Sequence, residues 1–225
     1  MLGYCLVFAM LSAVIVVGAL AAAQRRPTWP RVGAWVLGGG GVLVAASFLV
    51  DPWMALLGGA ALLTTGLVLG VRLGAEVQQA AHLWPLAVVA LGADVWSVTS
   101  PEGVTRQVVE SGPSGLMHFV VLALPVPGVE LSPILGVGDV LFTGLLVGAV
   151  VRLGLSQRRV LVGLLTGFAC CLVGLLVIQL PIPALPFLAV GGVAALGRQA
   201  TPHRRELGLA VGFVVVFFLV RGLLV

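Results

Sequence analysis

Long apolar runs separated by short polar stretches dominate the pattern along the 225 residues. About 20 apolar helical residues cross the roughly 30 Å hydrocarbon core of a bilayer, and a helix satisfies its own backbone hydrogen bonds there. The pattern predicts eight spans, at 2–23, 32–50, 53–73, 82–99, 133–153, 160–180, 184–198 and 206–224. We therefore expect an all-α polytopic membrane protein with about eight transmembrane helices around a cavity that contains aspartates.

The stretch 100–132 interrupts this series because it holds charges, prolines and only a short apolar run at 116–124. Nine residues are too few to span a bilayer as a helix. The sequence Phe119-Val120-Val121-Leu122 is rich in aromatic and β-branched side chains, which favour strands. This run is predicted to be a short β-strand, with an interfacial segment as the alternative.

Small residues recur at intervals of four in several of these spans. The sets are Gly66, Gly70 and Gly74, then Gly144 and Gly148, and then Gly163 and Gly167. This spacing lets membrane helices approach closely and is typical of helix packing. We interpret the glycine run at 38–41 in the same way.

Composition confirms that most of the surface must face lipid, because only 9% of residues are charged and 60% are hydrophobic. A soluble domain has roughly a quarter of its residues charged. The three cysteines fall inside apolar runs without the spacing of a metal site, so we interpret them as small lipid-facing or core residues. They are Cys5, Cys170 and Cys171.

All twelve basic residues are arginines, and they cluster in the loops between spans, which argues against nucleic-acid binding. Ten lie on one side of the predicted membrane, namely Arg25, Arg26, Arg31, Arg72, Arg152, Arg158, Arg159, Arg198, Arg204 and Arg205. Only Arg106 and Arg221 lie on the other side. The positive-inside rule then places both termini and the loop 100–132 outside the cytoplasm, and this distribution fits a prokaryotic plasma membrane.

Asp94 and Asp139 are the only acidic residues within the apolar spans. A charge at membrane depth costs about 2.5–3.5 kcal/mol on insertion scales, so two of them call for a reason. Protonated aspartates that donate hydrogen bonds between helices are one reason, and a path for ions or protons is a second. A third is a catalytic dyad that shares a proton and activates water.

The flanking residues favour the dyad. Asp139 ends the sequence Gly136-Val137-Gly138-Asp139, in which glycines let another backbone approach the carboxyl group. Further along the chain, a Pro-Ala-Leu sequence at 183–185 opens the seventh span. Proline gives non-helical backbone at membrane depth, which is tolerated only inside protein or beside a cavity.

These motifs, together with Ala93-Asp94-Val95-Trp96, resemble the presenilin and signal peptide peptidase family of GxGD-type intramembrane aspartyl proteases, over residues 85–198. The resemblance implies that Asp94 and Asp139 are catalytic. It also implies that a second set of residues shapes the active site or binds substrate. These are Gly136, Val137, Gly138, Pro183, Ala184, Leu185, Phe119, Val120, Val121 and Leu122.

The resemblance implies a protease core in 82–198, and the predicted spans add three scaffold helices in 1–81 and an additional helix in 199–225. Partners would be the bilayer and transmembrane helices with cytoplasmic N-termini, with no cofactor, no metal and no nucleic acid. Ala93 departs from the family, which has tyrosine there, and the chain has four spans rather than six up to Asp94. A prepilin-type peptidase, a proton-coupled transporter and a catalytically silent helix-binding relative remain alternatives.

Overall fold

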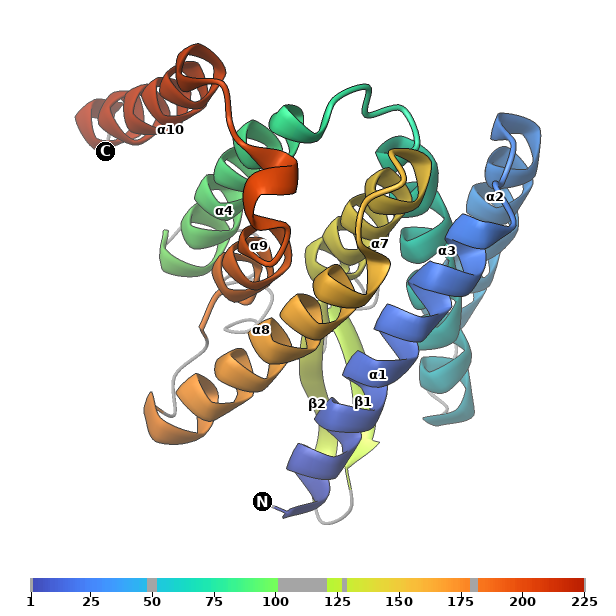
Figure 1. Ribbon diagram of the computed structural model, residues 1–225. Helices are drawn as coiled ribbons and strands as arrows, with labels where there is room; N and C mark the ends of the chain where they lie inside the picture. Colours follow the sequence, from blue (N-terminus) through green and yellow to red (C-terminus); the bar gives the residue numbers. More distant parts are fainter. Residues whose placement is uncertain (1, 48–51, 101–120, 127–128, 179–181, 225) are drawn as a thin grey trace.

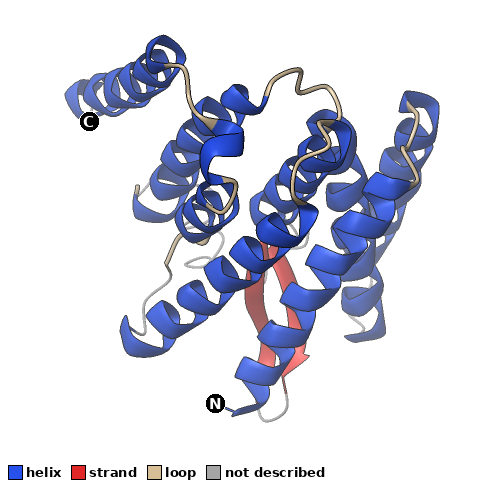
Figure 2. Cartoon of the chain, viewed as in Figure 1, coloured by secondary structure: helices blue, strands red, loops and turns tan. Residues whose placement is uncertain are grey.

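The computed structural model describes residues 2–47, 52–100, 121–126, 129–178 and 182–224, most of which are helical (Figures 1 and 2). Three helices come first, and a hairpin separates the fourth helix from the rest. The elements are α1 (Leu2–Gln24), α2 (Trp29–Ser47), α3 (Pro52–Gly74), the short η1 (Ala80–His82), α4 (Leu83–Thr99), β1 (Val121–Val126), β2 (Val129–Gly136), α7 (Val137–Arg152), α8 (Gln157–Ile178), α9 (Leu185–Ala194), η2 (Gly197–Ala200) and α10 (Arg204–Leu224).

Four stretches of the described residues are helical, long and apolar enough to cross a membrane. They are Cys5–Gln24, Leu57–Gly74, Ala80–Thr99 and Gln157–Ile178, while α9 is a shorter apolar helix. Several large apolar side chains are at least 70% exposed, namely Met10, Leu37, Val177 and Leu209, as lipid-facing residues would be. The prediction of a mostly helical chain is therefore confirmed, and its long apolar helices are consistent with an integral membrane protein. The number of spans stays a prediction.

β1 and β2 form a two-stranded antiparallel sheet in which Val121 pairs with Gly136 and Leu122 with Leu135. The strand predicted at 116–124 overlaps β1, whereas residues 116–120, including Phe119 and Val120, lie outside the described residues. The fifth span was predicted to begin at 133, and this is wrong because 133–136 belong to β2 and the helix begins at Val137. The register shifts beside Pro133, and such irregular positions suit a residue that lacks an N–H.

The core is centred on α7, which packs on α1, α3, α8 and α9. Its side chains Leu146, Val147 and Val150 are almost fully buried, and so are Ile15 of α1 and Leu188 of α9. The hairpin lies beside this core, because β1 packs on α3 and β2 leads directly into α7 (Figure 1).

Glycines set the distance between α3 and α7. A Cβ atom on Gly70 would collide with the Leu141 carbonyl oxygen, and one on Gly148 would collide with the Val71 carbonyl oxygen. Gly163 of α8 meets the backbone of α9 in the same way. The packing interpretation of these glycines is confirmed. In the run 38–41 it holds only for Gly39, because a Cβ on any of the other three would meet nothing within 4 Å in this chain.

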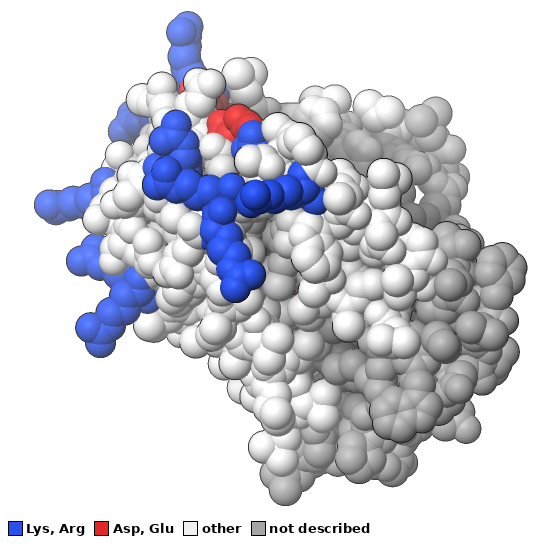
Figure 3. All heavy atoms as spheres, turned by 90° about the vertical axis from the view of Figure 1, so that its right-hand side faces the viewer, with Lys and Arg blue, Asp and Glu red and all other residues white. Residues whose placement is uncertain are grey.

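The loops between α1 and α2, α3 and α4, α7 and α8, and α9 and α10 lie at one end of the molecule (Figure 1). The N-terminus and the β1–β2 hairpin lie at the other end. Figure 3 shows the basic side chains gathered in one region of the surface, while the rest of the described surface in this view carries almost no charge. We call the end of the molecule that holds these four loops the arginine end.

Candidate active site

Asp139 lies in the first turn of α7, where it is only 7% exposed. Its Oδ2 accepts a hydrogen bond of 3.1 Å from the backbone N–H of Gly136, the residue that ends β2 and caps α7. A carboxylate at the third helical position commonly reaches back to the capping residue in this way. The helix start therefore fixes the orientation of the Asp139 side chain.

Asp94 lies toward the end of α4 and is half-buried. Its Oδ2 accepts a hydrogen bond of 3.0 Å from the backbone N–H of Leu185. Leu185 is the first residue of α9, where a helix has N–H groups without an internal partner. The Pro-Ala-Leu sequence thus brings the start of α9 directly onto Asp94.

Local sequence explains why α9 begins at this place. Ala184 is the N-terminal capping residue, and Pro186 occupies the first turn, where its missing N–H breaks no helical hydrogen bond. Ala184 and Leu185 are both buried. A Cβ atom on Gly138 would lie 3.8 Å from Cδ1 of Leu185, so the Gly-x-Gly-Asp and Pro-Ala-Leu sequences are neighbours in space.

The carboxyl groups of Asp94 and Asp139 are close enough to interact electrostatically, although they come from different helices. Within the described residues, each carboxyl has a hydrogen bond at Oδ2, from Leu185 and Gly136 respectively. The Oδ1 oxygen of each group has no hydrogen-bond partner among the described residues. Two acids within electrostatic range of each other can differ in protonation, so that one acts as an acid and the other as a base.

Cys171 of α8 is a residue of this site that sequence reasoning missed. Its thiol is buried and lies within electrostatic range of both Asp94 and Asp139. The interpretation as a small core residue is correct for its burial, but spacing along the chain gives no sign of its neighbours. Among the described residues, no three His, Cys, Asp or Glu side chains group as metal ligands would.

A mostly apolar groove of about 740 Å³ lies nearer the arginine end than the aspartates, and neither aspartate lines it. Its polar lining residues are Glu76, Gln78, His82 and Glu206. Leu86 and Val89 of α4 line it, together with Leu145 of α7 and Leu73 of α3. Leu145 and Val89 are six and five residues from Asp139 and Asp94, which is about 8–9 Å along a helix. The groove therefore extends between the two aspartate-bearing helices.

The hairpin places two further predicted site residues. Val121 and Leu122 lie in β1, and Val121 is the strand partner of Gly136. Val137 is the first residue of α7. The structure thus brings β1, the Gly-x-Gly-Asp sequence and the Pro-Ala-Leu sequence to one region, and the Phe119 and Val120 predictions lie outside the described residues.

Comparisons with protein-family models, with curated proteins and with solved structures find no match. The fold is mostly helical, and its long apolar helices and exposed apolar side chains are consistent with an integral membrane protein.

Proposed function

We propose that this chain is an intramembrane aspartyl protease of the presenilin and signal peptide peptidase type. The observation that carries the proposal is the approach of Asp94 and Asp139, the two acids of the apolar spans, from α4 and α7. The hydrogen bond from Leu185 to Asp94 adds support, because it joins the third motif to the pair.

The proposed reaction is hydrolysis of a peptide bond in a transmembrane helix. One aspartate, as the anion, takes a proton from water while the water oxygen attacks the scissile carbonyl carbon. The other aspartate donates its proton to the carbonyl oxygen. Collapse of the tetrahedral intermediate then breaks the C–N bond as the nitrogen accepts a proton, which leaves a carboxyl and an amino terminus.

The hairpin and the groove suggest how such a substrate binds. An unwound segment would add to the β1–β2 sheet through backbone hydrogen bonds, next to the Gly-x-Gly-Asp sequence. The adjoining helical part of the substrate would lie along the apolar groove between α4 and α7. Gly138 is exposed and carries no side chain to obstruct the approach to Asp139.

The direction in which α4 crosses the membrane determines which orientation of substrate helix we propose. With eight spans and the arginine end in the cytoplasm of a prokaryotic cell, α4 runs from the cytoplasm outward. On this basis we propose single transmembrane helices with cytoplasmic N-termini, including remnant signal peptides, as substrates.

Asparagine substitution of either aspartate tests the proposal in purified protein reconstituted with a model transmembrane substrate. We expect Asp94→Asn and Asp139→Asn each to lower the cleavage rate by at least about 10³-fold, because members of a catalytic unit fail together. Gly212→Ala on α10, where a Cβ atom meets nothing within 4 Å, serves as the control that retains the wild-type rate. Cleavage that survives either substitution contradicts the dyad. Ion flux without cleavage in the same liposomes favours a transporter instead.

A further inference from the structure

A second cavity, far in sequence from the aspartates, opens between α1, α2 and α3. Its volume is about 530 Å³, within the range of sites that bind small molecules. Gly18, Ala21 and Ala22 give α1 a shallow wall, and Leu63 and Leu67 form the opposite wall on α3. We call it the N-terminal cleft.

The walls of this cleft are suited to a hydrocarbon chain. Apart from two arginines, the polar side chains that line it are those of Trp35 and Thr64, and the Thr64 hydroxyl already donates to the Ala60 carbonyl oxygen of its own helix. None of the residues that line the cleft is acidic. An apolar ligand segment would therefore fit along most of its length without leaving polar groups unpaired.

The two arginines, Arg25 and Arg31, stand at the mouth of the cleft. Both are exposed, and neither forms an ion pair in the part of the chain that the structure describes. Arg26, between α1 and α2, has a φ of +46°, so the chain turns sharply at this mouth. Two guanidinium groups without an ion-pair partner among the described residues, at one end of an apolar cleft, favour a ligand with an anionic head group. A single guanidinium group can donate two parallel hydrogen bonds to the oxygens of one phosphate.

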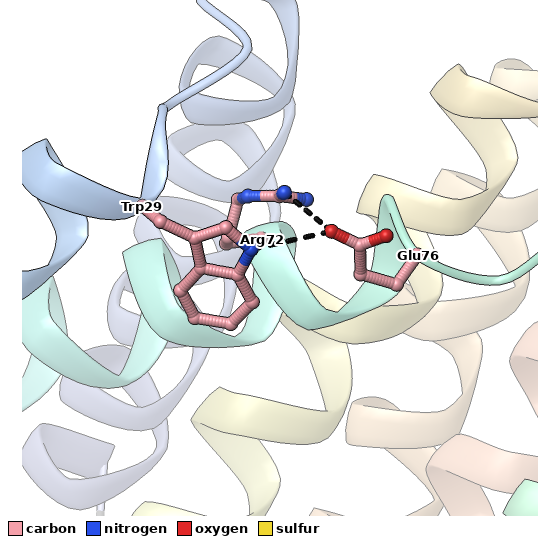
Figure 4. Close-up of polar contacts among 3 residues, drawn as sticks. All are labelled: Trp29, Arg72 and Glu76. Carbon is pink, nitrogen blue, oxygen red and sulfur yellow. Dashed lines mark hydrogen bonds and ion pairs between the residues drawn. The ribbon is translucent and has the colours of Figure 1, made fainter.

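Arg72 lies near the cleft but, unlike Arg25 and Arg31, it has an ion-pair partner. The contacts of Arg72 also hold the start of α2, where Arg31 lies. Arg72 at the end of α3 forms an ion pair with Glu76 and lies 4.6 Å from the centre of the Trp29 ring (Figure 4). The Trp29 Nε1–H donates a 3.3 Å hydrogen bond to the same carboxylate. This cluster anchors the first turn of α2 to α3, and it therefore fixes the backbone of Arg31, two residues further on.

The length of the cleft gives the length of the ligand. Val14 and Arg25 both line it, and eleven residues of helix extend about 16 Å. Half of the hydrocarbon core of a bilayer measures about 15 Å, which is one leaflet. A transmembrane helix about 10 Å wide would fill roughly 1,200 Å³ over that length, more than the cleft offers.

We propose that the N-terminal cleft binds an anionic phospholipid, with one acyl chain between α1, α2 and α3 and the phosphate at Arg25 and Arg31. Basic pockets between membrane helices commonly bind lipid head groups of this charge. The proposal does not depend on the proposed protease activity, since the cleft and the aspartates lie in different parts of the fold.

Native mass spectrometry of the detergent-purified full chain tests the site with phosphatidylglycerol, phosphatidylcholine and inorganic phosphate. We expect phosphatidylglycerol to bind the wild type at least tenfold more tightly than phosphatidylcholine. The double variant Arg25→Gln/Arg31→Gln should lose that preference. The matched control Arg158→Gln/Arg159→Gln removes two exposed arginines at the start of α8 and should retain it.

The apolar half of the site has its own variant. Ala21→Phe fills the cleft without changing any charge, and we expect it to weaken phosphatidylglycerol binding at least tenfold. Circular dichroism of each variant without added lipid checks that the helices are intact. Quenching of tryptophan fluorescence by phosphatidylglycerol with brominated chains should be smaller in Trp35→Phe than in wild type, because Trp35 lines the cleft.

Three results would overturn the proposal. The first is equal binding of the two phospholipids by the wild type, and the second is an equal loss in both double-arginine variants, which indicates diffuse surface charge. The third is that Ala21→Phe still binds phosphatidylglycerol and that inorganic phosphate fully displaces this lipid. That result would indicate a site for the head group alone, without an acyl chain in the cleft.

Discussion

Asp139 serves two purposes at the scale of the single residue. Its Oδ2 accepts a hydrogen bond from the Gly136 N–H at the start of α7, and the same carboxyl lies within electrostatic range of Asp94. A hydrogen bond of this kind contributes about 1 kcal/mol to stability, and the amide oxygen of asparagine can accept it as the carboxylate oxygen does. An asparagine substitution therefore separates chemistry from folding, whereas alanine would remove both.

Thr143 offers a stability test one turn further along α7. Its side chain is fully buried, and its Oγ1 has no hydrogen-bond partner among the described residues. Removing an unpaired buried hydroxyl without changing the shape of the side chain should be favourable. We predict that Thr143→Val raises the free energy of unfolding by about 1 kcal/mol, measured by denaturant titration in detergent.

Thr143→Ala is the matched control for that prediction, because it also removes the methyl group and leaves a small cavity. It should lower the free energy of unfolding by about 1 kcal/mol. If Thr143→Val destabilises the protein as much as Thr143→Ala does, the hydroxyl has a partner such as a buried water.

Sequence reasoning reached the two aspartates because buried acids in apolar spans are costly and therefore conspicuous. It did not foresee that the Leu185 N–H would bind Asp94, since a backbone group has no sequence signature. Cys171 was missed for a related reason. The hydrophobic pattern of a membrane helix is nearly uniform around its axis, so it does not reveal which face meets the site.

At the scale of the element, the pairing of α3 with α7 depends on backbone contact rather than on interlocking side chains. Gly70, Gly144 and Gly148 all lie where a Cβ atom would meet the backbone of the other helix. Because α7 carries Asp139, any separation of these two helices also moves one half of the candidate site.

We predict opposite effects of the same substitution at two glycines. Gly148→Ala should lower the free energy of unfolding by about 1–3 kcal/mol, because its methyl group would overlap the Val71 backbone. A Cβ atom on Gly212 would meet open space within a helix, so Gly212→Ala should raise the free energy of unfolding by about 0.5–1 kcal/mol. Thermal unfolding in detergent measures both, and equal midpoints for the two variants would contradict the close contact.

The hydrophobic pattern of the sequence does not show where β2 ends and α7 begins. Residues 133–136 continue the hydrophobic run that follows, yet they pair with β1. A short apolar run does not distinguish a buried strand from the first turn of a helix. Only the pairing partner decides, and β1 overlaps the short apolar run 116–124, in a stretch that otherwise holds charges and prolines.

At the scale of the whole molecule, charge asymmetry is the clearest property. The loops that hold most of the arginines share one end of the structure, as their spacing along the chain predicted (Figures 1 and 3). The count of spans was harder to predict, since α9 has only 10 residues and length alone does not show whether it crosses the bilayer.

Reporter fusions test the orientation in a bacterial host. Green fluorescent protein, which fluoresces only when it folds in the cytoplasm, should be bright when inserted at Gly154, an exposed turn with φ of +65° between α7 and α8. Fused to the C-terminus it should be dark, and alkaline phosphatase should be active there. Bright fluorescence from the C-terminal fusion would contradict either the orientation or the eight-span count.

Gly136 belongs at once to the sheet and to the candidate site, since it pairs with Val121 and donates its N–H to Asp139. If the proposed function is correct, a substrate strand added to the hairpin would bind next to Gly136, the residue whose backbone N–H orients the Asp139 carboxyl. The free energy gained when the substrate strand pairs with the hairpin would then lower the activation free energy of peptide-bond cleavage, rather than strengthen the initial binding of substrate. Substrates truncated beyond the scissile bond would keep their KM and lose kcat, as expected when recognition and chemistry share one stretch of backbone.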